Sequence, residues 1–338
     1  MENSQNHKKV SVIIPCLNEE RFIAGCLDSL LNQTYSNKNL EILIVDGMSK
    51  DKTREIVKKY TNKYNFIKLL DNPDKITPKA LNIGIKKANG NIIIRMDAHT
   101  KYKEDYIEKC VHYLKKTKTD NVGGIWIIRP SNNNIISQAI SYILQSPLGT
   151  GNAHYKTTKS KKPQEVDTVP FGCYKKEIFN KIGLFNEKLV RNQDIELNSR
   201  LRKNGGKILL IPEIKCYYYA PGNIKDFIKK NFSNGKWNIY TQKIIPNSLK
   251  LRHFIPFSFV MGIITSIILS FFTILGTILL SIILGSYLLV NIIFSFKITL
   301  KKKNLKLFPI LIFLFFVLHF SYGIGSLWGI LTMWKIEK

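Results

Sequence analysis

The feature that most constrains this chain is a pair of long stretches without charged residues in its C-terminal part. Phe254–Phe296 and Leu307–Trp334 contain no Asp, Glu, Lys or Arg. A helix needs ~20 apolar residues to cross a bilayer, so the first stretch is long enough for two spans and the second for one. We therefore predict an α-helical membrane region at 251–338, with spans at about 254–274, 277–296 and 307–330.

The charges around these stretches predict how the chain is oriented. Five lysines lie between the second and third spans: Lys297, Lys301, Lys302, Lys303 and Lys306. Short basic loops stay in the cytoplasm, and two spans separate this loop from the N-terminal part, so both are expected on the cytoplasmic side. Met1–Lys9 is polar and lacks the apolar core of a signal peptide. We expect a multi-pass protein of the cell membrane with Lys335–Lys338 outside; the rival topology exports the N-terminal domain.

Two features of the last apolar stretch allow more than one interpretation. Gly325 and Gly329 form a GxxxG pattern, which alone is a weak indication of close helix packing. His319 is the titratable residue of the apolar spans. It either contacts a lipid diphosphate or forms hydrogen bonds between helices.

Before these stretches, short apolar runs alternate with amphipathic segments. Runs rich in Ile and Val occur at Val10–Pro15, Glu41–Asp46, Phe66–Leu70 and Asn91–Asp97, and segments with helical periodicity lie between them. This alternation predicts an α/β fold with a largely parallel sheet and helices on both faces. Ligands bind at the carboxyl ends of the strands in such sheets, where Asp46 and Asp97 are expected.

Composition limits the classes of partner. The formal net charge of +27 lies outside the apolar stretches and favours anionic lipid or a phosphorylated substrate, although a Lys- and Asn-rich genome is an equally simple explanation. Charge alone suggests nucleic acid, but no binding motif supports it and the apolar spans oppose it. The five cysteines are widely spaced and form no CxxC pair, so we expect free thiols in a reducing compartment.

A basic amphipathic segment joins the two parts of the chain. At 223–250, aromatic and aliphatic residues recur at helical spacing among lysines. Next to a membrane span, this pattern is typical of an interfacial helix, and a helix packed on the sheet is the alternative. The predicted domains are therefore 1–222, 223–250 and 251–338.

Asp97 and His99 form a D-x-H triplet at the end of a predicted strand. A carboxylate and an imidazole together suit Mn²⁺. Mg²⁺ or Mn²⁺ at this place can neutralise the diphosphate that leaves when a sugar–phosphate bond is cleaved. A D-x-H triplet alone is a very weak signal, and taken in isolation it favours a surface turn.

Four blocks in order along the chain carry a resemblance to a known family. They are VSVIIPCLNEE, EILIVDGMSKDKT, KALNIGIKKANGNIIIRMDAH and VRNQDIELNSRLRKNGG. The region from Val10 to Trp237 resembles the family 2 glycosyltransferases of the Rossmann-like GT-A fold. The block VDTVPFGCYKKEIFNKIGLFNEKLVRNQD and the membrane tail are similar to the succinoglycan-biosynthesis glucosyltransferase subgroup.

The resemblance implies how a nucleotide-sugar donor is bound. It assigns donor binding to Pro15, Asn18, Glu19, Asp46, Asp51, Asn82 and Asp97, with Asp46 on the base. Gly47 stands where the family usually has a second Asp, which puts that contact in doubt. Asp97 and His99 match the ends of the family's D-x-D motif, with His99 in place of the usual Asp; the subgroup shares this replacement, so a divalent Mn²⁺ or Mg²⁺ is still expected.

The resemblance also implies the acceptor side of the reaction. Asp194 matches the catalytic Asp, which takes a proton from the acceptor hydroxyl, and the family inverts the anomeric centre. At the start of a helix, Asp194 is alternatively an N-cap. Acceptor binding is assigned to Gly172, Gln193 and Trp237; stacking on the acceptor sugar and a place in the membrane interface remain open for Trp237.

These implications predict an inverting, metal-dependent hexosyltransferase. Its donor is expected to be a UDP-sugar, with glucose favoured, and its acceptor a polyprenyl-diphosphate-linked glycan or cell-surface polysaccharide, as in exopolysaccharide biosynthesis. Processive members carry a Q-x-x-R-W block, of which the segment at 232–237 keeps only Trp237, so addition of one or a few sugars is favoured. The rivals are a processive polysaccharide synthase and a catalytically silent membrane scaffold that binds nucleotide, which Gly47 and His99 favour.

Overall fold

The computed structural model describes residues 10–151, 153–158 and 160–336. These residues form two compact units. The sheet unit comprises the chain up to Ile127 and Thr158–Tyr218, and the helical unit comprises Ile128–Thr157 and the chain from Tyr219 onward. The domain boundaries at 222 and 250 stay predictions. The expectations for Met1–Lys9 and for the chain end at Glu337 and Lys338 lie outside the described residues.

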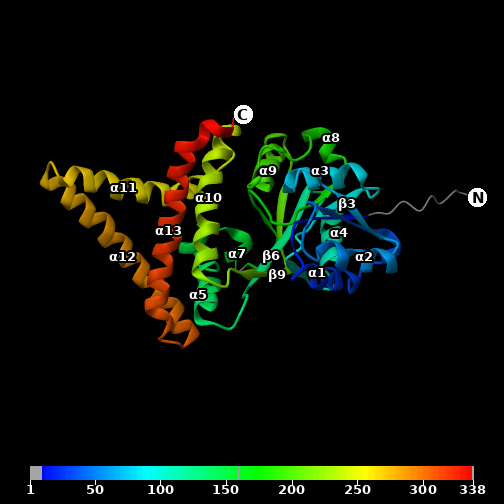
Figure 1. Ribbon diagram of the computed structural model, residues 1–338, viewed down its shortest axis with the longest axis horizontal. Coiled ribbons are helices and arrows are strands. Elements are labelled where there is room, and N and C mark those ends of the chain that lie inside the picture. The colour runs from blue at the N-terminus through cyan, green and yellow to red at the C-terminus, as the bar shows by residue number, and fades with distance from the viewer. Residues whose placement is uncertain (1–9, 152, 159, 337–338) are drawn as a thin grey trace, which may run out of the picture. The chain divides into compact units, whose positions relative to one another are not determined.

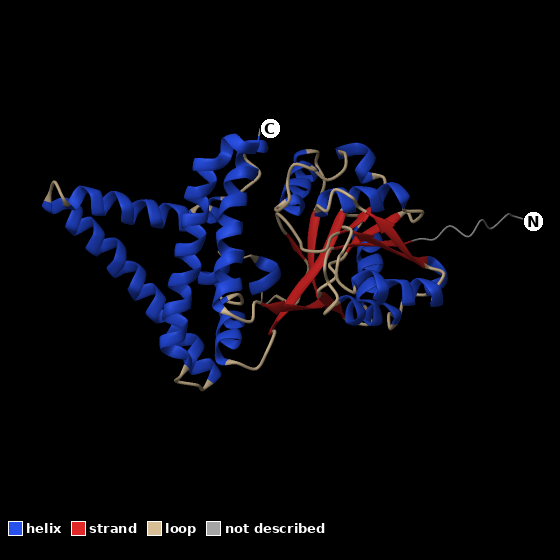
Figure 2. Cartoon of the chain, in the orientation of Figure 1, coloured by secondary structure: helices blue, strands red, loops and turns tan. Residues whose placement is uncertain are grey.

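The described part of the sheet unit is built on one sheet, whose strands are red in Figure 2. The strand order is β3-β2-β1-β4-β8-β6-β9-β5, and β7 pairs with β9. β3, β2, β1 and β4 are parallel, and the strands after β4 pair antiparallel in β4–β8, β8–β6, β9–β5 and β9–β7. The strands are β1 (Val10–Cys16), β2 (Leu40–Asp46), β3 (Ile67–Asp71), β4 (Ile92–Arg95), β5 (Thr100–Tyr102), β6 (Asn121–Pro130), β7 (Gln164–Glu165), β8 (Cys173–Lys175) and β9 (Ile208–Ala220).

Helices cover both faces of the parallel strands because successive strand residues point to opposite sides. In β1, Val12 and Ile14 join a core with Leu27 of helix α1, whereas Ile13 lies against Gly84 of helix α3. The α/β prediction is therefore confirmed. The helices and 3₁₀ turns of this unit are α1 (Ile23–Leu31), η1 (Asn37–Asn39), α2 (Thr53–Lys63), α3 (Thr77–Lys87), α4 (Tyr106–Thr117), α8 (Ile178–Ile182) and α9 (Gln193–Lys203).

The helical unit consists of long helices with short ones between them (Figure 1). The amphipathic segment forms one helix, α10, and the apolar stretches form α11, α12 and α13. The elements are α5 (Ile135–Ile143), α6 (Pro147–Thr150), α7 (His154–Thr157), α10 (Ile224–Ile244), η2 (Leu251–His253), α11 (Ile255–Ser270), α12 (Ile274–Lys302), α13 (Leu307–Thr332) and η3 (Met333–Ile336).

Of the three predicted membrane spans, the first, at 254–274, is wrong. In the described residues, α12 and α13 are long and apolar enough to cross a membrane, by length and composition alone. The segment predicted as a span at 254–274 forms the 16-residue helix α11 instead. At 1.5 Å per residue α11 is about 24 Å long, shorter than the ~30 Å hydrocarbon core. The chain turns at Phe271–Thr273, before the expected turn at Gly276, because Gly276 is already inside α12.

His319 is hydrogen-bonded within the helical unit. Its Nε2 lies 3.0 Å from the carbonyl oxygen of Leu148, and its Nδ1 lies 3.0 Å from the hydroxyl of Tyr287. A carbonyl only accepts, so Nε2 carries the proton and Nδ1 accepts from the tyrosine. Of the two interpretations of His319, the structure therefore has the hydrogen bonds between helices.

Candidate active site

A pocket of about 220 Å³ opens at the carboxyl ends of the parallel strands. Five of the predicted site residues line it: Pro15, Glu19, Asp97, His99 and Gln193. Strand β1 delivers Pro15, and Asp97 and His99 follow β4 directly. The pocket is also lined by residues for which the sequence predicted no role, among them Arg95, Asn72 and Lys75. The topology therefore brings together three of the residues predicted to bind the donor, Pro15, Glu19 and Asp97, where a parallel sheet binds its ligands.

Arg95, the last residue of β4, joins two of the predicted carboxylates. One guanidinium nitrogen lies 2.9 Å from Oδ1 of Asp97 and the other 3.1 Å from Oδ2 of Asp194. The side chain is buried and lies over the ring of Phe171, with 5.5 Å from the guanidinium carbon to the ring centroid. A buried charge is tolerated when it is paired. Arg95 therefore fixes the carboxylate after β4 and the carboxylate of α9 on one cation.

Asp194 occupies the second position of α9 and is not the N-cap of that helix, which is Asn192. Burial raises the pKa of its carboxyl, the charge of Asp97 raises it further, and Arg95 opposes both. In the described part of the chain, Oδ1 of Asp194 is buried and has no hydrogen-bond partner. The alternative role as an N-cap is therefore wrong, and one oxygen of this carboxylate is left without a donor.

The possible metal ligands lie on the wall of the same pocket. Nδ1 of His99 is 3.2 Å from Oε1 of Glu19, and Asp97 keeps one oxygen outside its ion pair with Arg95. No group of three or more His, Cys, Asp or Glu side chains suited to a metal occurs among the described residues. A carboxylate and an imidazole still fit Mn²⁺ or Mg²⁺, because such ions commonly take only one or two protein ligands beside substrate phosphates.

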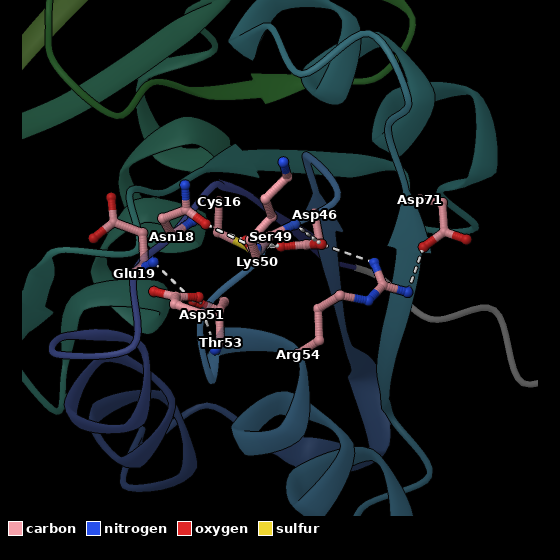
Figure 3. A network of polar contacts seen from close by, with 10 residues as sticks. All are labelled: Cys16, Asn18, Glu19, Asp46, Ser49, Lys50, Asp51, Thr53, Arg54 and Asp71. Atoms are coloured by element: carbon pink, nitrogen blue, oxygen red, sulfur yellow. Dashed lines mark hydrogen bonds and ion pairs between the residues drawn. The ribbon is translucent and has the colours of Figure 1, made fainter.

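Asp46, which the resemblance places on the base, is the centre of an internal network (Figure 3). Its side chain is fully buried; it accepts from the backbone N–H of Ser49 at 2.9 Å and from Arg54 at 2.7 Å. Burial alone would raise the pKa of Asp46, but the hydrogen bonds from Ser49 and Arg54 hold it below its usual range. Asp46 does not line the pocket; its contacts hold the segment that follows β2.

Two other residues that were predicted to bind the nucleotide-sugar donor, Asn18 and Asp51, hold the loops after β1 and β2 together (Figure 3). The backbone N–H of Asn18 donates to Oγ of Ser49 at 2.8 Å, and its side-chain oxygen accepts from the N–H of Lys50 at 2.9 Å. Asp51 accepts from the N–H and hydroxyl of Thr53 at 3.0 and 2.6 Å. Asn18 and Asp51 thus shape the pocket rim through the backbone, and their contact with a donor stays a prediction.

Asn82, Gly172 and Trp237 are not among the residues that line the pocket. The side chain of Asn82 forms two hydrogen bonds to the backbone of Phe185, at 2.9 and 3.0 Å. The carbonyl of Gly172 accepts from the N–H of Arg95 at 3.1 Å. Trp237 belongs to α10 of the helical unit and stacks edge-on against Tyr240. The binding roles of these three residues stay predictions.

The residues for which the sequence predicted no role carry recognisable signals. Arg95 is the one charge inside the run NIIIRM, and a charge within a buried strand needs a partner.

The packing around Gly47 limits which residue can stand there. A Cβ on Gly47 would approach Cδ1 of Leu17 to 3.2 Å and Cα of Lys75 to 3.3 Å. The usual second Asp therefore does not fit at this position without a shift, because the segment carrying Lys75 packs on Gly47.

The comparisons with known proteins agree with this arrangement. Residues 11–183 match the family described as "Glycosyl transferase family 2". The chain is 31% identical over 325 residues to the dolichyl N-acetyl-alpha-D-glucosaminyl phosphate 3-beta-D-2,3-diacetamido-2,3-dideoxy-beta-D-glucuronosyltransferase of Methanococcus voltae, covering 93% of this chain and 95% of the relative. It is 27% identical over 250 residues to the succinoglycan biosynthesis protein ExoA of Rhizobium meliloti, covering 72% and 73%.

Among solved structures, the chain is similar to the mannosyltransferase PcManGT from Pyrobaculum calidifontis in complex with GDP-Man and Mn²⁺. The TM-score is 0.61 at 17% identity, over 95% of this chain and 87% of that chain. At this identity the likeness concerns the fold alone, and it confirms the GT-A type of α/β domain expected from the sequence.

Proposed function

This chain belongs to glycosyltransferase family 2, and from that premise we propose that it is an inverting, metal-dependent enzyme which transfers a sugar from a nucleotide-sugar to a lipid-linked acceptor. The observation that carries the proposal is the ion-pair cluster of Arg95, Asp97 and Asp194 beside the pocket. Arg95 and Asp97 line the pocket, and Asp194, the candidate base, is not itself a lining residue but is paired with Arg95.

Asp194 acts as the general base. A hydroxyl of the acceptor that donates to Oδ1 satisfies the unpartnered oxygen and passes its proton there as the hydroxyl oxygen attacks the anomeric carbon. Burial and Asp97 raise the pKa of Asp194, which makes its carboxylate a stronger base than an exposed one. A base that activates the acceptor hydroxyl directly implies a single displacement, and hence inversion.

Asp97 and His99 would hold the divalent ion, and Glu19, whose Oε1 lies 3.2 Å from Nδ1 of His99, would be close enough to take part. When bound, the ion supplies positive charge that neutralises the diphosphate of the leaving nucleotide. Arg95 and Lys75 line the same pocket and add two cationic side chains of the chain itself. Arg95 also offsets the repulsion between the carboxylates of Asp97 and Asp194 when both are ionised.

For the donor we propose a UDP-sugar. The subgroup resemblance favours glucose, and the relative named for diacetamidoglucuronosyl transfer widens the choice to other hexose derivatives. For the acceptor we propose a polyprenyl-linked glycan at the cytoplasmic face of the cell membrane, since one relative is named for a dolichyl phosphate acceptor. The paired Asp97 and Asp194 oppose the silent-scaffold alternative, and no observation favours a processive synthase.

The test is release of nucleoside diphosphate by the purified full-length protein in detergent. A panel of UDP- and GDP-sugars is supplied with Mn²⁺, Mg²⁺ or chelator, and total membrane lipids serve as acceptor. We expect metal-dependent, lipid-stimulated turnover of one donor, and none in Asp194→Asn. Nucleotide binding without turnover of any donor supports the silent scaffold instead.

A further inference from the structure

The helix α10 runs alongside α13 through a closely packed seam within the helical unit. Gly235 of α10 and Gly325 of α13 each sit where a Cβ would collide with a backbone carbonyl of the other helix, those of Tyr322 and Phe232 respectively. A Cβ on Gly329 would likewise lie 2.9 Å from the carbonyl oxygen of Lys236. The GxxxG pattern of α13, formed by Gly325 and Gly329, therefore allows close packing against α10.

Hydrogen bonds extend the same seam to the ends of both helices. The hydroxyl of Tyr240 lies 2.8 Å from that of Thr332, and Nζ of Lys243 donates to the carbonyl of Met333 at 3.3 Å. Partner numbers rise together from Phe232 with Gly325 to Lys243 with Met333, so the two helices are parallel. Figure 1 shows them side by side. Whatever depth the C-terminal half of α13 takes in a membrane, α10 takes as well.

A stripe of lysines runs the length of α10. Lys225, Lys229, Lys236 and Lys243 are four or seven residues apart, so they share one face of the helix. From Lys225 to Lys243 the stripe measures about 27 Å, close to the ~30 Å of a hydrocarbon core. If α13 crossed a bilayer, this stripe would lie across the hydrocarbon, where charged side chains are strongly disfavoured. A position of the paired helices along the membrane surface avoids this cost.

The hairpin of α11 and α12 projects away from this pair (Figure 1). Its turn is apolar and open: Phe271, Phe272 and Ile274 are 81, 79 and 76% exposed. Only 6% of the most apolar window of α12 is buried by protein, against 39% for α13. Apolar surface of this extent requires a hydrocarbon environment. The hairpin, and not α13, is thus the part of the unit suited to insertion.

The lengths of the helices fix how the hairpin meets α13. The start of α11 packs on α13 at Gly323, where a Cβ would lie against Pro256 and Val260, and the end of the apolar part of α12 meets the start of α13 through Phe296 and Phe308. From Leu307 to Gly323, α13 is about 24 Å long, α11 is about 24 Å, and α12 from Ile274 to Phe296 is about 33 Å.

Sides of about 24, 24 and 33 Å form a nearly right-angled triangle, so α11 stands across α13. Its turn then lies about 24 Å from α13, which is less than the ~30 Å needed to reach the opposite surface. The lysines that follow, Lys297 to Lys303, return to the level of α13, and Lys302 lies 4.3 Å from the ring centroid of Tyr142 in α5. Lysines therefore flank both α10 and the base of the hairpin, as anionic headgroups require.

We propose that the helical unit is a monotopic membrane-binding surface: α10 and α13 lie in the headgroup region of an anionic leaflet, and the α11–α12 hairpin enters the hydrocarbon and returns to the same side. This arrangement replaces the multi-pass topology expected from the sequence. The acceptor would thus be presented from the leaflet that holds the enzyme. The proposal needs no catalytic activity, so its test is independent of the donor assay.

The test adds one cysteine at a time to the full-length protein, expressed in bacterial membranes, and keeps the native cysteines. The five native cysteines are all buried, which keeps the background low. Thr273→Cys marks the hairpin turn and Lys303→Cys the α12–α13 turn. Trp334→Cys, in η3, marks the chain directly after α13, and Lys59→Cys, at an exposed position of α2, marks the side of the sheet unit. A membrane-impermeant maleimide is applied to right-side-out and to inverted sealed vesicles, with and without detergent.

We expect Lys303→Cys and Trp334→Cys to label only from the side that labels Lys59→Cys, and Thr273→Cys to label from neither side until detergent is added. Labelling of Lys303→Cys and Trp334→Cys from opposite sides means that α13 spans the bilayer and overturns the proposal. Labelling of Thr273→Cys from the side opposite to Lys59→Cys means that the hairpin spans, and overturns it equally.

Discussion

The guanidinium of Arg95 and the carboxylate of Asp194 form an ion pair of 3.1 Å between the end of β4 and the first turn of α9. The pair joins a strand residue to a helix residue that lies far later in the chain. Arg95 also pairs with Asp97, which is predicted to bind the sugar donor. A substitution of Arg95 therefore affects this carboxylate and the proposed base, Asp194, together.

Removal of the Arg95 charge is expected to move the pH dependence of the reaction. Burial raises the pKa of Asp194 and Arg95 opposes that rise, so Arg95→Gln should raise it further. The base is active when deprotonated, and the acidic limb of kcat/KM therefore moves to higher pH in Arg95→Gln. Arg95→Lys keeps the charge and should leave the limb near its wild-type position. Identical pH profiles in all three proteins would contradict this role for Arg95.

Asp194→Asn is expected to abolish transfer and to leave donor affinity nearly unchanged, because the amide cannot take the acceptor proton while it keeps the size of the side chain. General bases contribute about 10²–10⁴-fold to rate, which sets the expected loss in kcat. Calorimetric titration with the donor and a turnover assay separate the two effects. Substantial residual turnover removes Asp194 from the role of base.

Asp97→Ala is expected to weaken donor binding in Mn²⁺, because the ion loses a carboxylate ligand. His99→Asp is the matched variant, since it restores the acidic residue usual in the family and should keep or strengthen Mn²⁺ binding. Electron paramagnetic resonance of Mn²⁺ reports on the ion directly, without turnover. If Asp97→Ala binds Mn²⁺ and donor like the wild type, the ion is held elsewhere.

Arg54→Met is expected to destabilise the sheet unit, because it leaves the fully buried carboxylate of Asp46 without its cation. Ser49 still donates to Asp46, so the loss is that of a hydrogen bond between charged groups, which contributes about 1.5–3 kcal/mol. The low pKa of Asp46 makes this stabilisation present at neutral pH and lost as the pH falls through that pKa, so the difference from wild type shrinks in acid. Urea unfolding at two pH values checks it, with Lys58→Met on the exposed side of α2 as control.

Gly325→Ala is expected to loosen the seam between α10 and α13, because the added methyl meets the backbone of Phe232. Overpacking costs about 1–3 kcal/mol. Gly285→Ala in α12 is the control: nothing lies within 4 Å of a Cβ at that position, and alanine is the better helix former. Thermal stability in detergent, followed by size-exclusion chromatography, should fall for Gly325→Ala and not for Gly285→Ala.

Local patterns were enough to predict the parallel half of the sheet, since apolar runs and amphipathic helices alternate at β1 to β4. The family blocks placed Asp97, His99 and Asp194 on the candidate site. The same blocks assigned Asp46 to the base of the nucleotide, and that contact stays a prediction; the structure adds that the carboxylate of Asp46 accepts hydrogen bonds from Ser49 and Arg54. Which way a side chain at a strand end points depends on the loop that covers it, and no spacing rule records that loop.

The sequence by itself determined that the chain has an α/β domain followed by apolar helices, because hydropathy and periodicity are properties of local segments. Only the tertiary structure decided that Arg95 pairs with Asp194, because residues distant in sequence meet through the sheet. It also decided that α11 is too short to span and that α13 lies against the lysine-bearing α10. Hydropathy describes the environment that suits an isolated helix. The environment of a helix in the folded protein also depends on the helix that packs beside it.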